Sequence, residues 1–245
     1  MSRFILSLQF LTIIPFSQNI KVKEEDLGKS MLYFPLAGLF IGGCLVVLNQ
    51  IFSFLLPQSV VDGLIITSLA VITGSMHLDA LADTIDGIGS GKERKEKLRI
   101  MKDATVGAMG VVAIILVLSL KYLALNAIPG TLKNQALLVM PVMGRWSQVI
   151  VSYFSTYAGL KRGLGSPFTT HVSLSIFVGA SIMAVFLTSC LFLVKGAVIA
   201  GTVVVFSFIY SLFFKRILGG VTGDVLGAGN EIIEVAVLIM ILAIA

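Results

Sequence analysis

Long apolar stretches occupy most of this 245-residue chain and leave little polar sequence between them. Hydrophobic residues make up 57% of the chain and charged residues only 13%, about half of what a soluble domain usually carries. A soluble protein of this length has to cover a large surface with polar groups, and these charges are too few for that. The composition therefore excludes a disordered chain, a disulfide-rich secreted module and an ordinary soluble globule.

The apolar stretches predict an all-α, polytopic integral membrane helical bundle with about six or seven transmembrane helices, because a helix needs about 20 apolar residues to cross a bilayer. The whole chain, 1–245, is predicted to be a single membrane domain. The predicted spans are 31–56, 60–85, 104–128, 134–157, 172–194, 196–214 and 231–245. The last has fifteen residues, so it is expected to be short, oddly tilted or re-entrant.

The N-terminal segment is predicted to be a short interfacial helix within 3–14, since Phe4, Leu8 and Leu11 recur at helical spacing. It contains Pro15 and lacks the small-residue cleavage site of a signal peptide, so we expect it to be retained. The two cysteines both lie in apolar runs, which predicts small buried or lipid-facing side chains and neither a disulfide nor a metal site.

Basic residues are distributed unevenly between the loops. Fourteen of the eighteen Lys and Arg residues fall in the N-terminal segment and in the loops 87–103, 158–171 and 215–230, whereas the alternate loops hold only Lys133 and Lys195. The positive-inside rule places the N-terminal segment and these three loops on the cytoplasmic side of the membrane. The net charge of +5 is thus explained by topology, and no nucleic-acid partner is expected.

Three aspartates follow one another at positions i, i+4 and i+7 of one helical segment. At about 100° per residue, Asp79, Asp83 and Asp86 fall on a narrow stripe of the helix. Three like charges on one face repel each other unless a cation lies among them, and oxygen ligands without thiols suit Mg²⁺ or Mn²⁺. The alternative is ion pairing with the basic segment 92–102, which explains one or two of these acids but not all three.

Other candidate residues are expected near the same side of the membrane. Lys102 belongs to the basic segment 92–102, which would attract a polyphosphate or serve only as a topology determinant. Thr222, Gly223 and Asp224 lie in a glycine-rich stretch whose backbone N–H groups can hold phosphate, or which is a flexible loop with Asn230 as a helix cap. Asp103, Glu231 and Glu234 are also expected at or beside cytoplasmic span ends.

Two candidates lie inside apolar runs. Arg145 needs an anion there, either an aspartate partner or a substrate phosphate. His77 is off the aspartate stripe, so it is expected to be a hydrogen-bonded packing residue, with a substrate contact as the second interpretation. Acidic, basic and glycine-rich elements on one side favour metal-assisted phosphoryl transfer, but they do not identify a substrate.

These motifs resemble those of the adenosylcobinamide-GDP ribazoletransferase (cobalamin synthase) family, and the resemblance covers nearly the whole chain. The motifs are His77-Leu-Asp79-x-x-x-Asp83-x-x-Asp86-Gly87, Arg99-Ile-Met-Lys102-Asp103-x-x-x-Gly107-x-x-Gly110 and Thr222-Gly223-Asp224-x-Leu226-Gly227. One departure is Ala80, where a glycine is usual in the family.

The resemblance implies a Mg²⁺-dependent membrane enzyme that joins adenosylcobinamide-GDP to α-ribazole or α-ribazole 5′-phosphate and releases GMP. Asp79, Asp83 and Asp86 would be the catalytic and metal-binding carboxylates, with Asp103 and Asp224 as further metal contacts. Substrate contacts would come from His77, Lys102, Arg145, Thr222 and Gly223. The other expected partner is the lipid bilayer, and the small-residue face at 38–43 would permit a homo-oligomer.

Two other functions match these residues less well. A CDP-alcohol phosphotransferase carries a similar acidic motif, but it expects Ala-Arg shortly after Asp-Gly, and here Asp86-Gly87 is followed by Ile-Gly-Ser-Gly. A cation transporter would need a path to both faces, and no comparable acids line the outer half.

Overall fold

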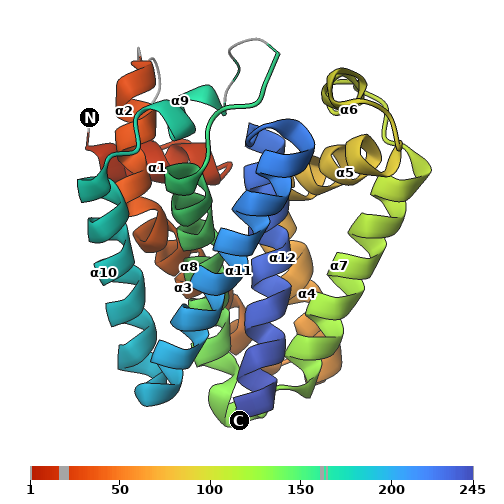
Figure 1. The fold of residues 1–245 in the computed structure, drawn as a ribbon. Coiled ribbons are helices and arrows are strands. Elements are labelled where there is room, and N and C mark those ends of the chain that lie inside the picture. The colour runs from red at the N-terminus through yellow and green to blue at the C-terminus, as the bar shows by residue number, and fades with distance from the viewer. Residues whose placement is uncertain (1, 17–21, 161–162, 164, 245) are drawn as a thin grey trace.

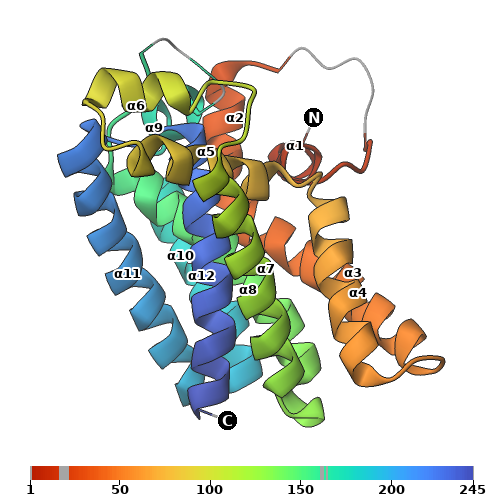
Figure 2. The ribbon, with the colours of Figure 1, turned by 90° about the vertical axis from the view of Figure 1, so that its right-hand side faces the viewer.

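The computed structural model describes residues 2–16, 22–160, 163 and 165–244. These residues form a bundle of long helices, with short helices gathered at one end (Figure 1; Figure 2). Lys21, Lys161 and Arg162, which we expected on the cytoplasmic side, lie outside the described residues.

Six helices within the described ranges are long and apolar enough to cross a membrane, and a bent helix pair raises the total to seven. The unbroken spans are α3 (Phe34–Ser53), α7 (Ala108–Ala127), α8 (Gly130–Phe154), α10 (Leu174–Phe192), α11 (Val194–Leu218) and α12 (Gly223–Ile244). The remaining elements at the end that holds the N-terminus are α1 (Arg3–Leu11), α2 (Glu24–Ser30), η1 (Met31–Tyr33), α6 (Arg94–Ile100) and α9 (Ser166–Thr170). The predicted polytopic helical membrane bundle is confirmed.

The predicted span 60–85 is wrong as a single helix. It is divided into α4 (Gln58–Ile72) and α5 (Met76–Gly89), whose axes are bent by 85°. Gly74 and Ser75 both have positive φ, at 59° and 56°, and two successive left-handed residues end a right-handed helix. As a result α5 lies across the end of the bundle and carries its aspartates there (Figure 1).

The last helix is longer than predicted. Helix α12 starts at Gly223, so its 22 residues are long enough to span, and the expectation of a re-entrant segment over 231–245 is wrong. The predicted helix began too late because residues 223–230 include Asp224, Asn230 and three glycines, which are typical of a loop but are helical in the structure. Asn230 is therefore inside the helix and is not its cap.

Helix α8 lies at the centre of the bundle, where its second half is buried almost completely. Its close approach to α3 depends on two glycines: a Cβ atom at Gly38 would lie 2.5 Å from the carbonyl oxygen of Pro141, and one at Gly42 would lie 2.7 Å from that of Leu137. The small-residue face at 38–43 is thus used mainly inside the chain, although Gly43 faces open space.

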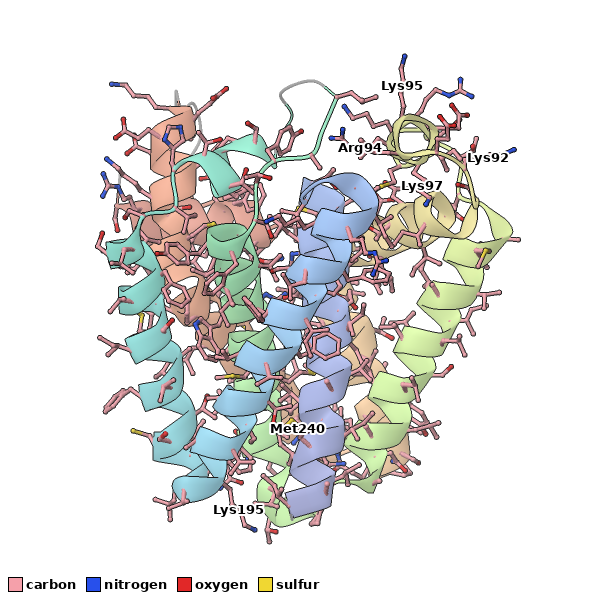
Figure 3. The ribbon with its side chains drawn as sticks, in the orientation of Figure 1. Lys92, Arg94, Lys95, Lys97, Lys195 and Met240 are labelled. Atoms are coloured by element: carbon pink, nitrogen blue, oxygen red, sulfur yellow. The ribbon has the colours of Figure 1, made fainter. Side chains whose placement is uncertain are left out.

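The two ends of the bundle differ in charge. Lys92, Arg94, Lys95 and Lys97 lie at the end where α5 and α6 are found, whereas Lys195 lies at the opposite end, with the C-terminus (Figure 3; Figure 1). This arrangement brings the predicted acidic and basic motifs to one end of the molecule.

Candidate active site

The aspartates of α5 meet the beginning of α12. The carboxylate of Asp83 lies within electrostatic range of Asp79, Asp86 and Asp224. The two helices pack closely there, since a Cβ atom at Gly227 would lie 2.6 Å from the methyl group of Ala80. Ala80, which stands where the family usually has glycine, therefore packs against a glycine of α12.

Asp79 and Asp83 have carboxylates that are free to bind a ligand. Asp79 is exposed and Asp83 is half-buried, and neither side chain has a hydrogen bond or an ion pair with another described residue. The predicted alternative, ion pairing with the basic segment 92–102, is absent from the described structure. Two adjacent carboxylates without cationic partners favour the presence of a cation.

Asp86 lies on the same helical stripe as Asp79 and Asp83, but its carboxylate has a different environment. One carboxylate oxygen accepts the backbone N–H of Gly107 at 2.7 Å and the other accepts that of Gly110 at 2.8 Å. Asp86 therefore caps the N-terminus of α7 from the neighbouring helix, where a negative charge is favoured. Glycine at both positions leaves room for this cap, because a Cβ atom at either would lie within 2.6 Å of the carboxylate and displace it.

We predict that Asp86→Asn lowers stability more than its small change in shape suggests. An asparagine side chain accepts through only one atom, so its NH₂ group would face a backbone N–H donor of α7. We expect a loss of about 1–2 kcal/mol, measured as a lower midpoint of thermal unfolding in detergent. A midpoint equal to that of the wild type would show that the cap does not stabilise α7.

Two other predicted site residues lie on the segment between α6 and α7. The ammonium group of Lys102, which is exposed, lies within electrostatic range of Asp224. Asp103 is exposed and accepts hydrogen bonds from the hydroxyl and backbone N–H of Thr105, at 2.8 and 3.1 Å. These bonds lower the pKa of the Asp103 carboxyl. Asp103 thus has a structural partner in the loop before α7.

The glycine-rich turn before α12 is held in place. The backbone of Val221 donates to Thr156 and accepts from Ala158, both at 2.9 Å, in a parallel bridge. Arg94 donates to the carbonyl oxygens of Leu218 and Ala158, at 2.5 and 3.3 Å. Sequence reasoning missed this role of Arg94, because the residue is one of six basic residues in its segment and its partners are backbone atoms far along the chain.

The hydroxyl of Thr222 is part of the same turn. It accepts the N–H of Val225 and donates to the carboxylate of Asp224, each at 3.3 Å. Gly223 lies at the first position of α12, against Gly165, where a Cβ atom on Gly165 would be 2.3 Å from the Gly223 nitrogen. Two chain segments therefore approach each other closely at the start of α12.

A cavity of about 230 Å³ adjoins the carboxylates. Asp79 and Asp224 form part of its wall, and His77 and Gln148 form another polar part. The Nε2 atom of His77 lies 3.0 Å from the Nε2 atom of Gln148, and both side chains are buried. His77 thus has the hydrogen-bonded, buried position that we expected, but it also lines a cavity.

Arg145 has a glutamate partner inside the bundle. Its guanidinium binds Glu234, which also binds Lys121, and Lys121 lies 2.7 Å from Glu231. All four side chains are buried. The expectation of an aspartate partner for Arg145 is wrong, and so is the placement of Glu231 and Glu234 at a span end, because α12 begins eight residues before Glu231. These charges connect α7, α8 and α12 inside the bundle.

The acidic cluster fits a divalent cation by the chemistry of its donors. Asp79, Asp83 and Asp224 supply oxygen ligands only, which suits Mg²⁺ better than Zn²⁺. Among the described residues, no three acidic, histidine or cysteine side chains lie close enough together to hold a metal ion by themselves. Mg²⁺ commonly keeps several waters and takes further ligands from substrate phosphates, so it does not require a complete cage of protein ligands.

Comparison with known proteins identifies close relatives of the whole chain. A profile of the cobalamin-5-phosphate synthase family matches residues 3–242. A protein named adenosylcobinamide-GDP ribazoletransferase from Geotalea daltonii is 40% identical, and the alignment covers 98% of this chain and 97% of that protein. Proteins of the same name from Syntrophobacter fumaroxidans and Acetivibrio thermocellus are 38% and 35% identical, covering 97% and 98% of this chain and 96% and 97% of theirs. No solved structure matches the chain.

Proposed function

Since the chain belongs to the cobalamin-5-phosphate synthase family, we propose that the aspartates of α5 and α12 carry out its reaction. The protein is an adenosylcobinamide-GDP ribazoletransferase of cobalamin biosynthesis. We propose further that the reaction depends on Mg²⁺, that these aspartates bind the ion, and that the second substrate is α-ribazole or its 5′-phosphate.

The proposed step is a phosphoryl transfer. A hydroxyl of α-ribazole attacks the phosphorus nearer the cobinamide, a new P–O bond forms, and the P–O bond to the GMP portion breaks. The hydroxyl proton passes to a carboxylate, and GMP leaves with the bridging oxygen. Asp79 or Asp83 accepts this proton, because both oxygens of Asp86 already accept backbone N–H groups.

Charge in the transition state is distributed over the phosphate oxygens. Mg²⁺ held by Asp79, Asp83 and Asp224 would neutralise part of it and orient the diphosphate. We propose that Lys102, whose charge lies within electrostatic range of Asp224, binds the phosphate of the leaving GMP. Asp103 and Arg145 are less well placed for such contacts, because Asp103 has Thr105 as its partner and Arg145 has Glu234.

We also propose that this end of the bundle faces the cytoplasm from the inner membrane of a prokaryotic cell. The basic residues of α6 and the segment before it lie there, with the N-terminus, in agreement with the positive-inside rule. The water-soluble substrates would then reach the carboxylates without crossing the bilayer.

The single observation that carries the mechanism is the pair of free carboxylates, Asp79 and Asp83, beside Asp224. We predict that purified protein releases GMP from adenosylcobinamide-GDP and α-ribazole only when a divalent cation is present. Chelation with EDTA should abolish GMP release, and added Mg²⁺ should restore it, as measured by chromatography of the nucleotides. Undiminished turnover in EDTA would contradict the metal-dependent mechanism. Absence of GMP release with Mg²⁺ and folded protein would contradict the reaction itself.

A further inference from the structure

We infer that the cavity beside the carboxylates binds the aromatic base of α-ribazole. This inference rests on the proposed function and extends it, because it assigns a site to one of the two substrates. The base of α-ribazole is a dimethylbenzimidazole, a flat and mainly apolar double ring with one free ring nitrogen that accepts a hydrogen bond. The cavity has an apolar side that suits the double ring and a polar side that suits the ring nitrogen.

The apolar wall is built from aromatic side chains that contact one another. The ring of Phe168 lies 4.7 Å from that of Phe10 and 5.8 Å from that of Phe34, measured between centroids. Met31 and Met76 complete this side of the cavity. Aromatic rings and methionine sulfur pack well against a flat aromatic ligand.

The polar wall offers one donor and one acceptor. The amide nitrogen of Gln148 can only donate, so the Nε2 atom of His77 accepts from it at 3.0 Å, and the ring proton of a neutral His77 is on Nδ1. That Nδ1 atom and the Oε1 atom of Gln148 are buried without a hydrogen-bond partner. His77 is 2% exposed and Gln148 is 5% exposed.

Buried polar atoms without partners are uncommon in proteins, and these two belong to residues that line the same cavity, so we assign them to the binding of a ligand there. The Nδ1–H of His77 can donate to the free ring nitrogen of the base. The Oε1 atom of Gln148 can accept from a hydroxyl of the ribose. Each group of the protein then meets a complementary group of the same nucleoside.

The cavity also places the nucleoside correctly for the reaction. Asp79 and Asp224 line the same space, so a ribose attached to the bound base would lie at the carboxylates that receive the hydroxyl proton. The volume of about 230 Å³ is below the usual range of ligand pockets, about 300–1,000 Å³, so the cavity suits a small ligand and not a corrin ring. The aromatic wall suits the mainly apolar double ring of α-ribazole better than guanine, because phenylalanine and methionine offer no partner to polar edge groups.

The test separates the two substrates kinetically. His77→Leu removes the donor and Phe168→Ala removes part of the aromatic wall, and each should raise KM for α-ribazole by about tenfold or more. KM for adenosylcobinamide-GDP should stay within about twofold of the wild-type value, since that substrate does not use the cavity. Phe186→Ala is the matched control, because Phe186 is 64% exposed on α10, and both of its KM values should be unchanged.

A second measurement uses an analogue of α-ribazole in which the free ring nitrogen is replaced by CH. Wild-type protein should use this indole nucleoside at least about tenfold less efficiently than α-ribazole, whereas His77→Leu should use the two equally. A merely structural role of His77 would leave the discrimination intact.

The outcomes are distinguishable. Wild-type protein without GMP release would overturn the proposed function, and the inference with it. Active protein in which the cavity variants raise KM for adenosylcobinamide-GDP instead, or in which His77→Leu still discriminates between the two nucleosides, would overturn the assignment of the cavity and leave the reaction standing.

Discussion

Replacing Asp83 with asparagine should lower the rate of GMP release by at least about 10³-fold, the order of effect seen when a group that stabilises transition-state charge is removed. Asp83 lies within electrostatic range of Asp79, Asp86 and Asp224, so the substitution removes both a negative ligand and a proton acceptor from the cluster. Asparagine has the same shape but can neither take up the proton nor carry the charge.

The same variant should fold at least as well as the wild type. Asp83 has like-charged neighbours and no ion-pair partner among the described side chains, so removal of its charge relieves repulsion. We therefore expect lost turnover together with an unchanged or higher midpoint of thermal unfolding, the combination that marks a functional residue.

The control for this variant is Glu96→Gln, which removes an acid from the neighbouring helix α6. Glu96 is paired with Arg99 at 2.8 Å on an exposed surface, and such pairs contribute little. Its GMP release should equal that of the wild type. Near-normal activity of Asp83→Asn under the same conditions would remove Asp83 from the catalytic set.

Replacing Glu234 with alanine should have the largest effect on stability. Glu234 binds both Lys121 and Arg145 inside the bundle, and Asn230 donates to it at 3.1 Å. Without Glu234, Arg145 would lose its ion-pair partner among the described side chains. Breaking a buried ion pair from one side typically costs about 3–5 kcal/mol, because the remaining charge stays buried. We expect little folded protein after extraction, measured by size-exclusion chromatography and thermal unfolding in detergent.

Glu231→Gln provides the graded comparison for this prediction. Lys121 keeps Glu234 as a partner when the charge of Glu231 is removed, so this variant should lose clearly less stability. Glu25→Gln, at an exposed pair with Lys29, should lose almost none. Equal stability of Glu234→Ala and Glu25→Gln would show that the buried charges do not hold α7, α8 and α12 together.

Much of the fold could be predicted because long apolar stretches and the 3.6-residue period are local properties of the sequence. The break before α5 could not be predicted in this way. Gly74 and Ser75 interrupt a stretch that is apolar on both sides, and their left-handed conformation has no signature in hydropathy. The start of α12 was missed for the opposite reason, since its polar first turns are buried by neighbouring helices.

The candidate site, like the fold, could be predicted only as far as local sequence patterns allow. The stripe of Asp79, Asp83 and Asp86 follows from spacing alone, but only the tertiary structure separates Asp86, which caps α7, from the other two. The pair of glycines at Gly107 and Gly110 was a signal for this, because backbone N–H groups are most accessible where no Cβ atom covers them. The partner of Arg145 is 89 residues away in the sequence, and no local pattern specifies it.

The short first half of the broken span has a consequence for the membrane itself. Helix α4 has 15 residues and is about 22 Å long, whereas the hydrocarbon core of a bilayer is about 30 Å thick. Such a hydrophobic mismatch is relieved by local thinning of the bilayer. The headgroup layer and its water would then come closer to the break before α5, which would favour hydration of the carboxylates that follow it.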